Sequence, residues 1–152
     1  MKVDMKSLVK ANPDWFLYQL KKVKAFSVLS DAELLKISEQ MRSFDFKAGT
    51  TLVNQGESAN LFFIVREGSV EVSVKKFFFR EKRVAVLESG DYFGESVLVS
   101  DSKRTATVTA LTDTTCFVLL KPSFKSVLNQ NALSKANMKV VFARRKTQLN
   151  NA

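Results

Sequence analysis

The most informative absence in this sequence is histidine, which does not occur among its 152 residues. Its absence excludes Ser-His-Asp and Cys-His catalysis, zincin motifs and His-ligated metal sites. Cysteine occurs once, at Cys116, so a disulfide framework is excluded as well. A single cysteine in an apolar segment predicts simple core packing and a reducing compartment, and we therefore expect a cytoplasmic protein.

Long apolar runs are also missing, because the longest contain five residues, at Leu61 to Val65 and Cys116 to Leu120. Crossing a bilayer takes about 20 apolar residues, so no membrane span is expected. The first ten residues lack the apolar region of a signal peptide. Apolar residues nevertheless make up 45% of the chain and include 13 phenylalanines, which predicts a single globular domain over residues 1–152.

Acidic residues are scarce, above all towards the C-terminus. The chain has 24 Lys and Arg against 15 Asp and Glu, a formal net charge of +9, and after Asp113 it has seven basic residues and no acidic one. A basic surface favours anionic partners such as a nucleotide, a nucleic acid or an anionic lipid. Two interpretations of the basic C-terminal part stay open: a solvated helix face, or a docking surface for an acidic partner.

Glycine and proline are few and unevenly placed. All five glycines fall within residues 49–94, and both prolines fall outside that stretch. Because glycine supplies the positive φ angles that tight turns need, this distribution predicts a turn-rich β region between helices. We expect helices at about 14–41, a β-roll at about 44–120 and C-terminal helices at about 122–149.

Helical periodicity and capping signals support this order. Apolar residues recur at helical spacing over about 14–24, which predicts the first helix. Ser30 and Glu33 match an S-x-x-E capping box, so a second helix is expected to begin there. A longer helix is expected over about 132–149.

The β region is predicted from residues that alternate with period two and from short apolar runs. Val70, Val72 and Val74 alternate with polar residues, so their strand should have one buried and one wet face. The expected strands are Phe44 to Lys47, Thr51 to Val53, Leu61 to Arg66, Ser69 to Lys75, Arg83 to Leu87, Arg104 to Ala110 and Cys116 to Leu120. Many short strands with regular turns favour a jelly-roll β-barrel, and the expected class is α+β, mainly β.

One segment of the β region combines the groups that a nucleotide site needs. Gly94 lets the backbone approach a ligand closely, and the N–H groups after it can form an anion-binding nest. Arg104 is expected to open a strand and to offer a planar, permanently charged fork suited to phosphate. Glu95 offers a carboxylate that can accept hydrogen bonds from sugar hydroxyls. The plainer alternative is an exposed glutamate and an arginine in a surface ion pair.

A second segment strengthens the nucleotide interpretation, since Gly56 and Gly68 flank one buried strand. The two segments together resemble the cyclic nucleotide-binding domain family, which occurs in kinase regulatory subunits, gated channels and catabolite-activator-type regulators. The sequences F-G-E at 93–95 and R-T-A at 104–106 are similar to the family's phosphate-binding cassette. The resemblance extends over about residues 20–141 and implies a jelly-roll barrel flanked by helices.

The resemblance also implies a ligand-binding set that surrounds one cassette: Gly94, Glu95, Ser96, Val97, Arg104, Thr105 and Ala106. In that family's arrangement Glu95 accepts from the ribose 2′-hydroxyl, and Arg104 pairs with the cyclic phosphate. Backbone N–H groups of the cassette turn would bind the phosphate. Thr105 and Ala106 would lie beside the phosphate and the base.

The implied function is binding of cAMP or cGMP, without catalysis or a further cofactor, and transmission of occupancy to an effector through movement of the terminal helices. Two positions depart from the family's pattern. Val97 is branched where the family usually has a very small residue, and it is expected to crowd the sugar-phosphate. Lys103 replaces a frequent proline, which loosens the loop but adds a cation. The alternative is an interaction module that has kept the fold and lost the ligand.

Two further classes are less favoured by the sequence. A DNA-binding regulator of this family carries a helix-turn-helix domain after the barrel, and no such domain is expected in this chain. A cupin-like enzyme would need histidine or a cluster of carboxylates as metal ligands.

Two segments are candidates for contact with a protein effector. Three consecutive phenylalanines within Lys75 to Arg83 cannot all face one side of a strand, which predicts either a hairpin tip folded on itself or a partner or lipid contact. The last predicted helix places three apolar residues and one arginine on one stripe, and this helix is expected to close over a bound base and to become more ordered with ligand. That stripe consists of Met138, Phe142, Arg145 and Leu149.

Overall fold

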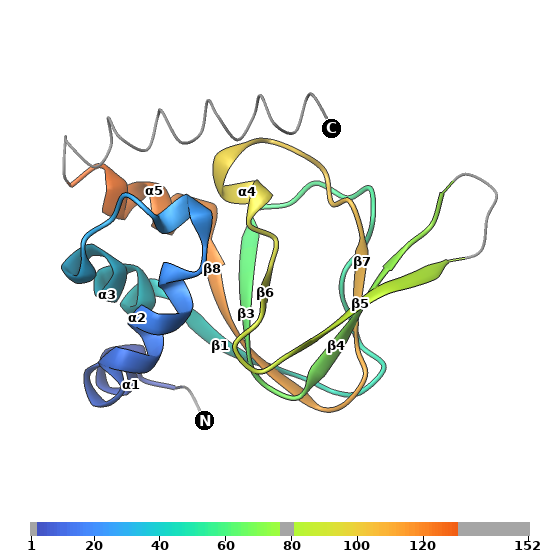
Figure 1. The fold of residues 1–152 in the computed structure, drawn as a ribbon, viewed down its shortest axis with the longest axis horizontal. Helices are drawn as coiled ribbons and strands as arrows, with labels where there is room; N and C mark the ends of the chain where they lie inside the picture. Colours follow the sequence, from blue (N-terminus) through green and yellow to red (C-terminus); the bar gives the residue numbers. More distant parts are fainter. Residues whose placement is uncertain (1–2, 77–80, 131–152) are drawn as a thin grey trace.

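The computed structural model describes residues 3–76 and 81–130 (Figure 1). Helices precede the β region, as the sequence predicts, and within the described residues one helix follows it where the first C-terminal helix is expected. The helical elements are α1 (Met5–Ala11), α2 (Pro13–Lys21), the 3-10 turn η1 (Lys24–Phe26), α3 (Asp31–Gln40), α4 (Ser96–Val99) and α5 (Lys121–Leu128). The sequence patterns do not predict α1 or α4, because both are too short to show clear helical periodicity.

The β region forms two four-stranded antiparallel sheets with the orders β1-β8-β3-β6 and β2-β7-β4-β5. The strands are β1 (Arg42–Phe46), β2 (Thr51–Val53), β3 (Leu61–Glu67), β4 (Ser69–Val74), β5 (Lys82–Glu88), β6 (Tyr92–Phe93), β7 (Thr107–Ala110) and β8 (Thr114–Leu120). Strands distant in sequence pair in both sheets, for example β1 with β8 and β2 with β7. The prediction of a mainly β jelly roll with flanking helices is confirmed.

The helix boundaries follow from local capping. The Ser30 side chain accepts from the Glu33 N–H, while the Glu33 carboxylate accepts from the Ser30 N–H, so the predicted capping box is present at the start of α3. Asp4 caps α1 by accepting from the N–H groups of Lys6 and Ser7. The N-terminal layer therefore begins earlier than the sequence patterns indicate.

The described residues form two apolar cores, and β3 contributes to both. Figure 1 shows α1, α2, α3 and α5 gathered on one side of the first sheet, with the second sheet on its other side. Phe62 and Ile64 belong to the cluster shared with the helices. Phe63 and Val65, whose side chains alternate with these, belong to a cluster between the two sheets. The strand is thus buried on both faces.

Three local predictions are wrong in detail. Arg104 does not open a strand, because β7 begins at Thr107 and Arg104 lies in the preceding loop. Ser73, expected on the wet face of β4, is buried at a register shift in the pairing of β4 with β5, and its hydroxyl donates to the Glu81 carboxylate at 2.8 Å. Val72 is only half buried because it lines a cavity described below.

Cys116 packs in the core between the sheets as predicted, and burial raises the pKa of its thiol to about 12. The phenylalanines at 77–79 and the helix expected at 132–149, with its stripe Met138, Phe142, Arg145 and Leu149, lie outside the described residues. Among the residues that are described, no helix is both long and apolar enough to cross a membrane.

Candidate functional site

The two sequence segments that predict the site meet at the backbone of Arg104. The N–H of Gly56 donates to the Arg104 carbonyl oxygen at 2.8 Å, and the Arg104 N–H donates to the Glu57 carbonyl oxygen at 2.8 Å. Ser58 and Lys103 form an isolated antiparallel bridge beside these bonds. Because Gly56 has φ +87°, it allows the tight turn that presents these groups. Main-chain hydrogen bonds therefore fix the backbone position of Arg104.

The guanidinium of Arg104 is held against β3. Its Nη2 donates to the Leu61 carbonyl oxygen at 2.8 Å, and its Cζ lies 5.8 Å from the centre of the Phe63 ring. Partial burial lowers the pKa of Arg104, but an arginine remains charged throughout the physiological range. Since one carbonyl and one ring satisfy only part of a five-donor fork, this cation is suited to receive an anion.

Gly94 allows the backbone to approach this guanidinium. It has φ +84°, and a Cβ built on it would lie 2.6 Å from Arg104 Nη1 and 2.9 Å from the Leu61 carbonyl oxygen. Any larger residue would have to displace both groups. Glycine is therefore needed at position 94 for two reasons: the positive φ angle, and the lack of space for a Cβ beside Arg104.

The structure brings five of the seven predicted site residues to one cavity of about 150 Å³. Those five are Gly94, Ser96, Arg104, Thr105 and Ala106. The remaining wall is apolar and comes from Val53, Val72, Phe93 and Val108. The cavity thus combines one fixed cation with apolar side chains from both sheets.

Glu95 lies next to the cavity in sequence but faces the helical layer. Its side chain belongs to a residue only 8% exposed, and its Oε1 accepts from the Ala25 N–H at 2.9 Å. Ala25 is the central residue of η1, 70 positions away in sequence. The predicted sugar acceptor therefore connects the cassette to the N-terminal helices in this structure.

Val97 also points away from the cavity. It is 1% exposed and packs in the core shared with the helices, together with Leu98 and Val99. Val97 is not among the residues that line the cavity. The expectation that Val97 crowds a sugar-phosphate assumes that its side chain faces the cavity. In this structure the side chain packs in the core shared with the helices.

Sequence reasoning missed the contributions of β3 to the site. The Leu61 carbonyl and the Phe63 ring both hold Arg104, yet neither residue type signals a ligand site. Apolar strand residues carry no chemical motif, so only the pairing of the strands could reveal them. Among residues 3–76 and 81–130, no group of three or more His, Cys, Asp and Glu could hold a metal ion.

These features define a class of protein: a jelly roll with flanking helices whose small cavity holds a fixed guanidinium beside a close-approach glycine. The sequence model of one family, described as the cyclic nucleotide-binding domain, matches residues 43–131, and the chain belongs to that family.

Two curated relatives carry the same domain. The cAMP-dependent protein kinase regulatory subunit of Yarrowia lipolytica is 37% identical over 109 residues, which cover 72% of this chain and 28% of that protein. The cGMP-dependent protein kinase of Plasmodium berghei is 35% identical over 104 residues, which cover 68% of this chain and 12% of that protein. The chain therefore spans less than a third of the length of either relative.

Solved structures show the same architecture. A cAMP-bound PfPKA-R structure has a TM-score of 0.70 at 28% identity and matches 78% of this chain and 42% of that one. The N-terminal domain of a transcriptional regulator from Streptomyces coelicolor A3(2) has a TM-score of 0.74 at 26% identity. That match covers 88% of this chain and 92% of the other, so the fold occurs in proteins of different regulatory classes.

Proposed function

We propose that this protein binds a 3′,5′-cyclic nucleotide in the cavity beside Arg104 and converts occupancy into movement of its terminal helices. The observation that carries the proposal is the convergence of Gly94, Ser96, Arg104, Thr105 and Ala106 on one cavity in a chain of this family. The predicted function is binding and not catalysis, since the groups around Arg104 are suited to holding a phosphate.

The cyclic phosphate is proposed to sit against Arg104 and the turn after Gly94. A guanidinium binds two phosphate oxygens at once, and a backbone without a Cβ lets the anion approach closely. A cavity of about 150 Å³ is small beside ligand pockets of roughly 300–1,000 Å³. We therefore infer that the phosphate and ribose enter the cavity and that the base lies at its mouth, beside Thr105.

The proposed role of Glu95 includes a local rearrangement. Its carboxylate, whose Oε1 accepts from the Ala25 N–H, is proposed to turn towards the cavity and accept from the ribose 2′-hydroxyl. Ala25 belongs to η1, so this step would change a contact of the N-terminal helical layer. Such a change gives occupancy a direct route to the helices, which supports a sensor with a protein effector.

Titration of the full chain with cAMP and with cGMP by isothermal calorimetry tests the proposal, with 5′-AMP as the control. We expect both cyclic nucleotides to bind, cAMP slightly more tightly, and 5′-AMP to bind at least about tenfold more weakly because its phosphate is not closed onto the ribose. Absence of heat with both cyclic nucleotides would favour the alternative, an interaction module that has lost the ligand.

A further inference from the structure

Helix α5 begins with Lys121, a cation at the helix end where positive charge is unfavourable. Lys121 is the first residue of α5, and the first turn of that helix contains no acidic residue. The N-terminus of a helix carries partial positive charge, so a cation there is electrostatically unfavourable. The Lys121 side chain is nevertheless only 14% exposed. Groups outside α5 must therefore stabilise this ammonium.

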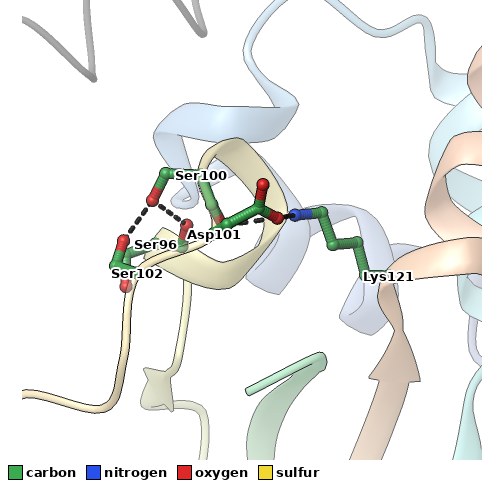
Figure 2. A network of polar contacts seen from close by, with 5 residues as sticks. All are labelled: Ser96, Ser100, Asp101, Ser102 and Lys121. Atoms are coloured by element: carbon green, nitrogen blue, oxygen red, sulfur yellow. Dashed lines mark hydrogen bonds and ion pairs between the residues drawn. The ribbon is translucent and has the colours of Figure 1, made fainter. Parts of the chain in front are cut away.

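Those groups lie in the loop that follows α4, as Figure 2 shows. The Lys121 ammonium donates to the Ser100 carbonyl oxygen at 3.2 Å and to Asp101 Oδ1 at 2.9 Å. The Asp101 side chain is fully exposed at 100%, so its ion pair is weakened by water. The Ser100 carbonyl oxygen is therefore the less exposed of the two groups that bind this largely buried ammonium.

Hydrogen bonds continue from Ser100 to the wall of the cavity. The Ser100 N–H and hydroxyl both donate to the Ser96 carbonyl oxygen, at 3.0 and 3.1 Å, and the same hydroxyl contacts that of Ser102 (Figure 2). Ser96 lines the cavity. The loop then runs on to Arg104, so Ser100 lies between two residues of the cavity wall and is hydrogen-bonded to one of them, Ser96.

The main chain of Lys121 gives a second connection. Its N–H donates to the Asn60 carbonyl oxygen at 2.8 Å. Asn60 directly precedes Leu61, whose own carbonyl accepts from the Arg104 guanidinium. The side chain of Lys121 is thus bonded to the loop that leads to Arg104, and its main chain is bonded to the residue before Leu61.

We propose that Lys121 is a positioning residue that couples occupation of the cavity to α5 through its bonds to Ser100 and Asp101. This inference rests on the proposed function and names the contact by which occupancy leaves the barrel towards the C-terminal side. An anion that fixes Ser96 also fixes Ser100, whose carbonyl oxygen holds the ammonium. Because coupling between sites is reciprocal, loss of the contact should change both the response of α5 and the affinity for the nucleotide.

The test compares Lys121→Met with Lys125→Met in the full chain. Lys125 is exposed on the same helix, so both variants lose one positive charge from α5. Affinity for cAMP is measured by calorimetry, and amide hydrogen exchange is followed over residues 94–106 and 121–128 with and without cAMP. Wild type and Lys125→Met should show slower exchange in both segments upon binding. Lys121→Met should show it only in 94–106, with affinity reduced roughly five- to tenfold.

Two further variants separate coupling from general destabilisation. Lys121→Arg should restore the response of α5, since a guanidinium can donate to the same two oxygens. Asp101→Ala removes the Oδ1 acceptor from a fully exposed position, so the variant should fold and lose part of the response. A normal α5 response and normal affinity in Lys121→Met would overturn the proposal, as would an unchanged response in Asp101→Ala if Lys121→Met does not fold. A wild-type chain that binds neither cyclic nucleotide would overturn the proposed function and this inference together.

Discussion

The two sides of the first sheet divide the candidate site into unlike halves. On the side facing the second sheet, Gly94 and Arg104 line a cavity with a fixed cation in its wall. On the side facing the helices, Glu95 and Val97 are buried, the first bonded to Ala25 and the second packed in the helical core. Residues adjacent in sequence thus lie in different surroundings.

This difference indicates how one short segment would serve both proposed roles, binding a nucleotide and transmitting its occupancy. The turn between β6 and α4 supplies a wall of the cavity and also part of the core that holds the helices. A ligand that shifts the turn by a small amount must alter contacts on both sides, because packed cores do not deform continuously. We therefore expect changes on the cavity side to affect affinity, and changes on the helical side to affect stability or response.

The largest expected effect follows from Arg104→Ala. Removing the guanidinium leaves the bound phosphate without its cation in a partly buried cavity, which should cost about 2–5 kcal/mol of binding free energy. Affinity for cAMP measured by calorimetry would then fall by at least about thirtyfold. Near-normal affinity would contradict the assignment of the phosphate to this cavity.

Arg66→Ala is the matched control for that variant. Arg66 lies on β3, the strand that holds Arg104, but its Cζ lies 5.4 Å from the centre of the Phe117 ring, on the helical side. The variant loses the same charge from the protein, so general attraction of an anion is reduced equally. Its affinity should stay within about twofold of wild type, and in both proteins added salt should weaken binding by screening the net charge.

A smaller effect is expected from Gly94→Ala, compared with Gly49→Ala. Both glycines have positive φ, +84° and +89°, but nothing lies within 4 Å of a Cβ at Gly49. Strain alone should cost Gly49→Ala about 1 kcal/mol of unfolding free energy, whereas Gly94→Ala should cost about 2–3 kcal/mol because Arg104 must also move. Urea denaturation measures both, and only Gly94→Ala should weaken cAMP binding. Equal effects would mean that the close approach to Arg104 has no consequence.

The sequence was sufficient for the fold class, for the order of helices and β region, and for those parts of the site that depend on residue type. Glycine turns, alternating valines and the Ser30–Glu33 capping box act locally, so they can be recognised without the tertiary structure. Arg104 and Gly94 were found because a phosphate needs a particular cation and a particular backbone. These two residues are indeed in contact in the structure.

The directions of Glu95 and Val97 could not be predicted in the same way. They depend on α4, a four-residue helix too short to have a recognisable period, which turns both side chains towards the helices. The partner of Glu95 is a backbone N–H 70 residues away, and every residue except proline has that group. Likewise, the Leu61 carbonyl that holds Arg104 has no signature in the sequence.

The smallest expected effects come from two valine-to-alanine variants, one on each side of the first sheet, and these variants test the division of the site directly. Val97→Ala and Val53→Ala remove the same atoms from buried valines that are 1% and 7% exposed, on the helical and the cavity side respectively. Each should lower the unfolding free energy by about 1–2 kcal/mol, measured in urea. Only Val53 lines the cavity, so only Val53→Ala should change cAMP affinity, by about two- to fivefold. If Val97→Ala changed affinity as much, the branched side chain would act on the ligand after all. The division of the site between two cores would then not hold in the bound protein.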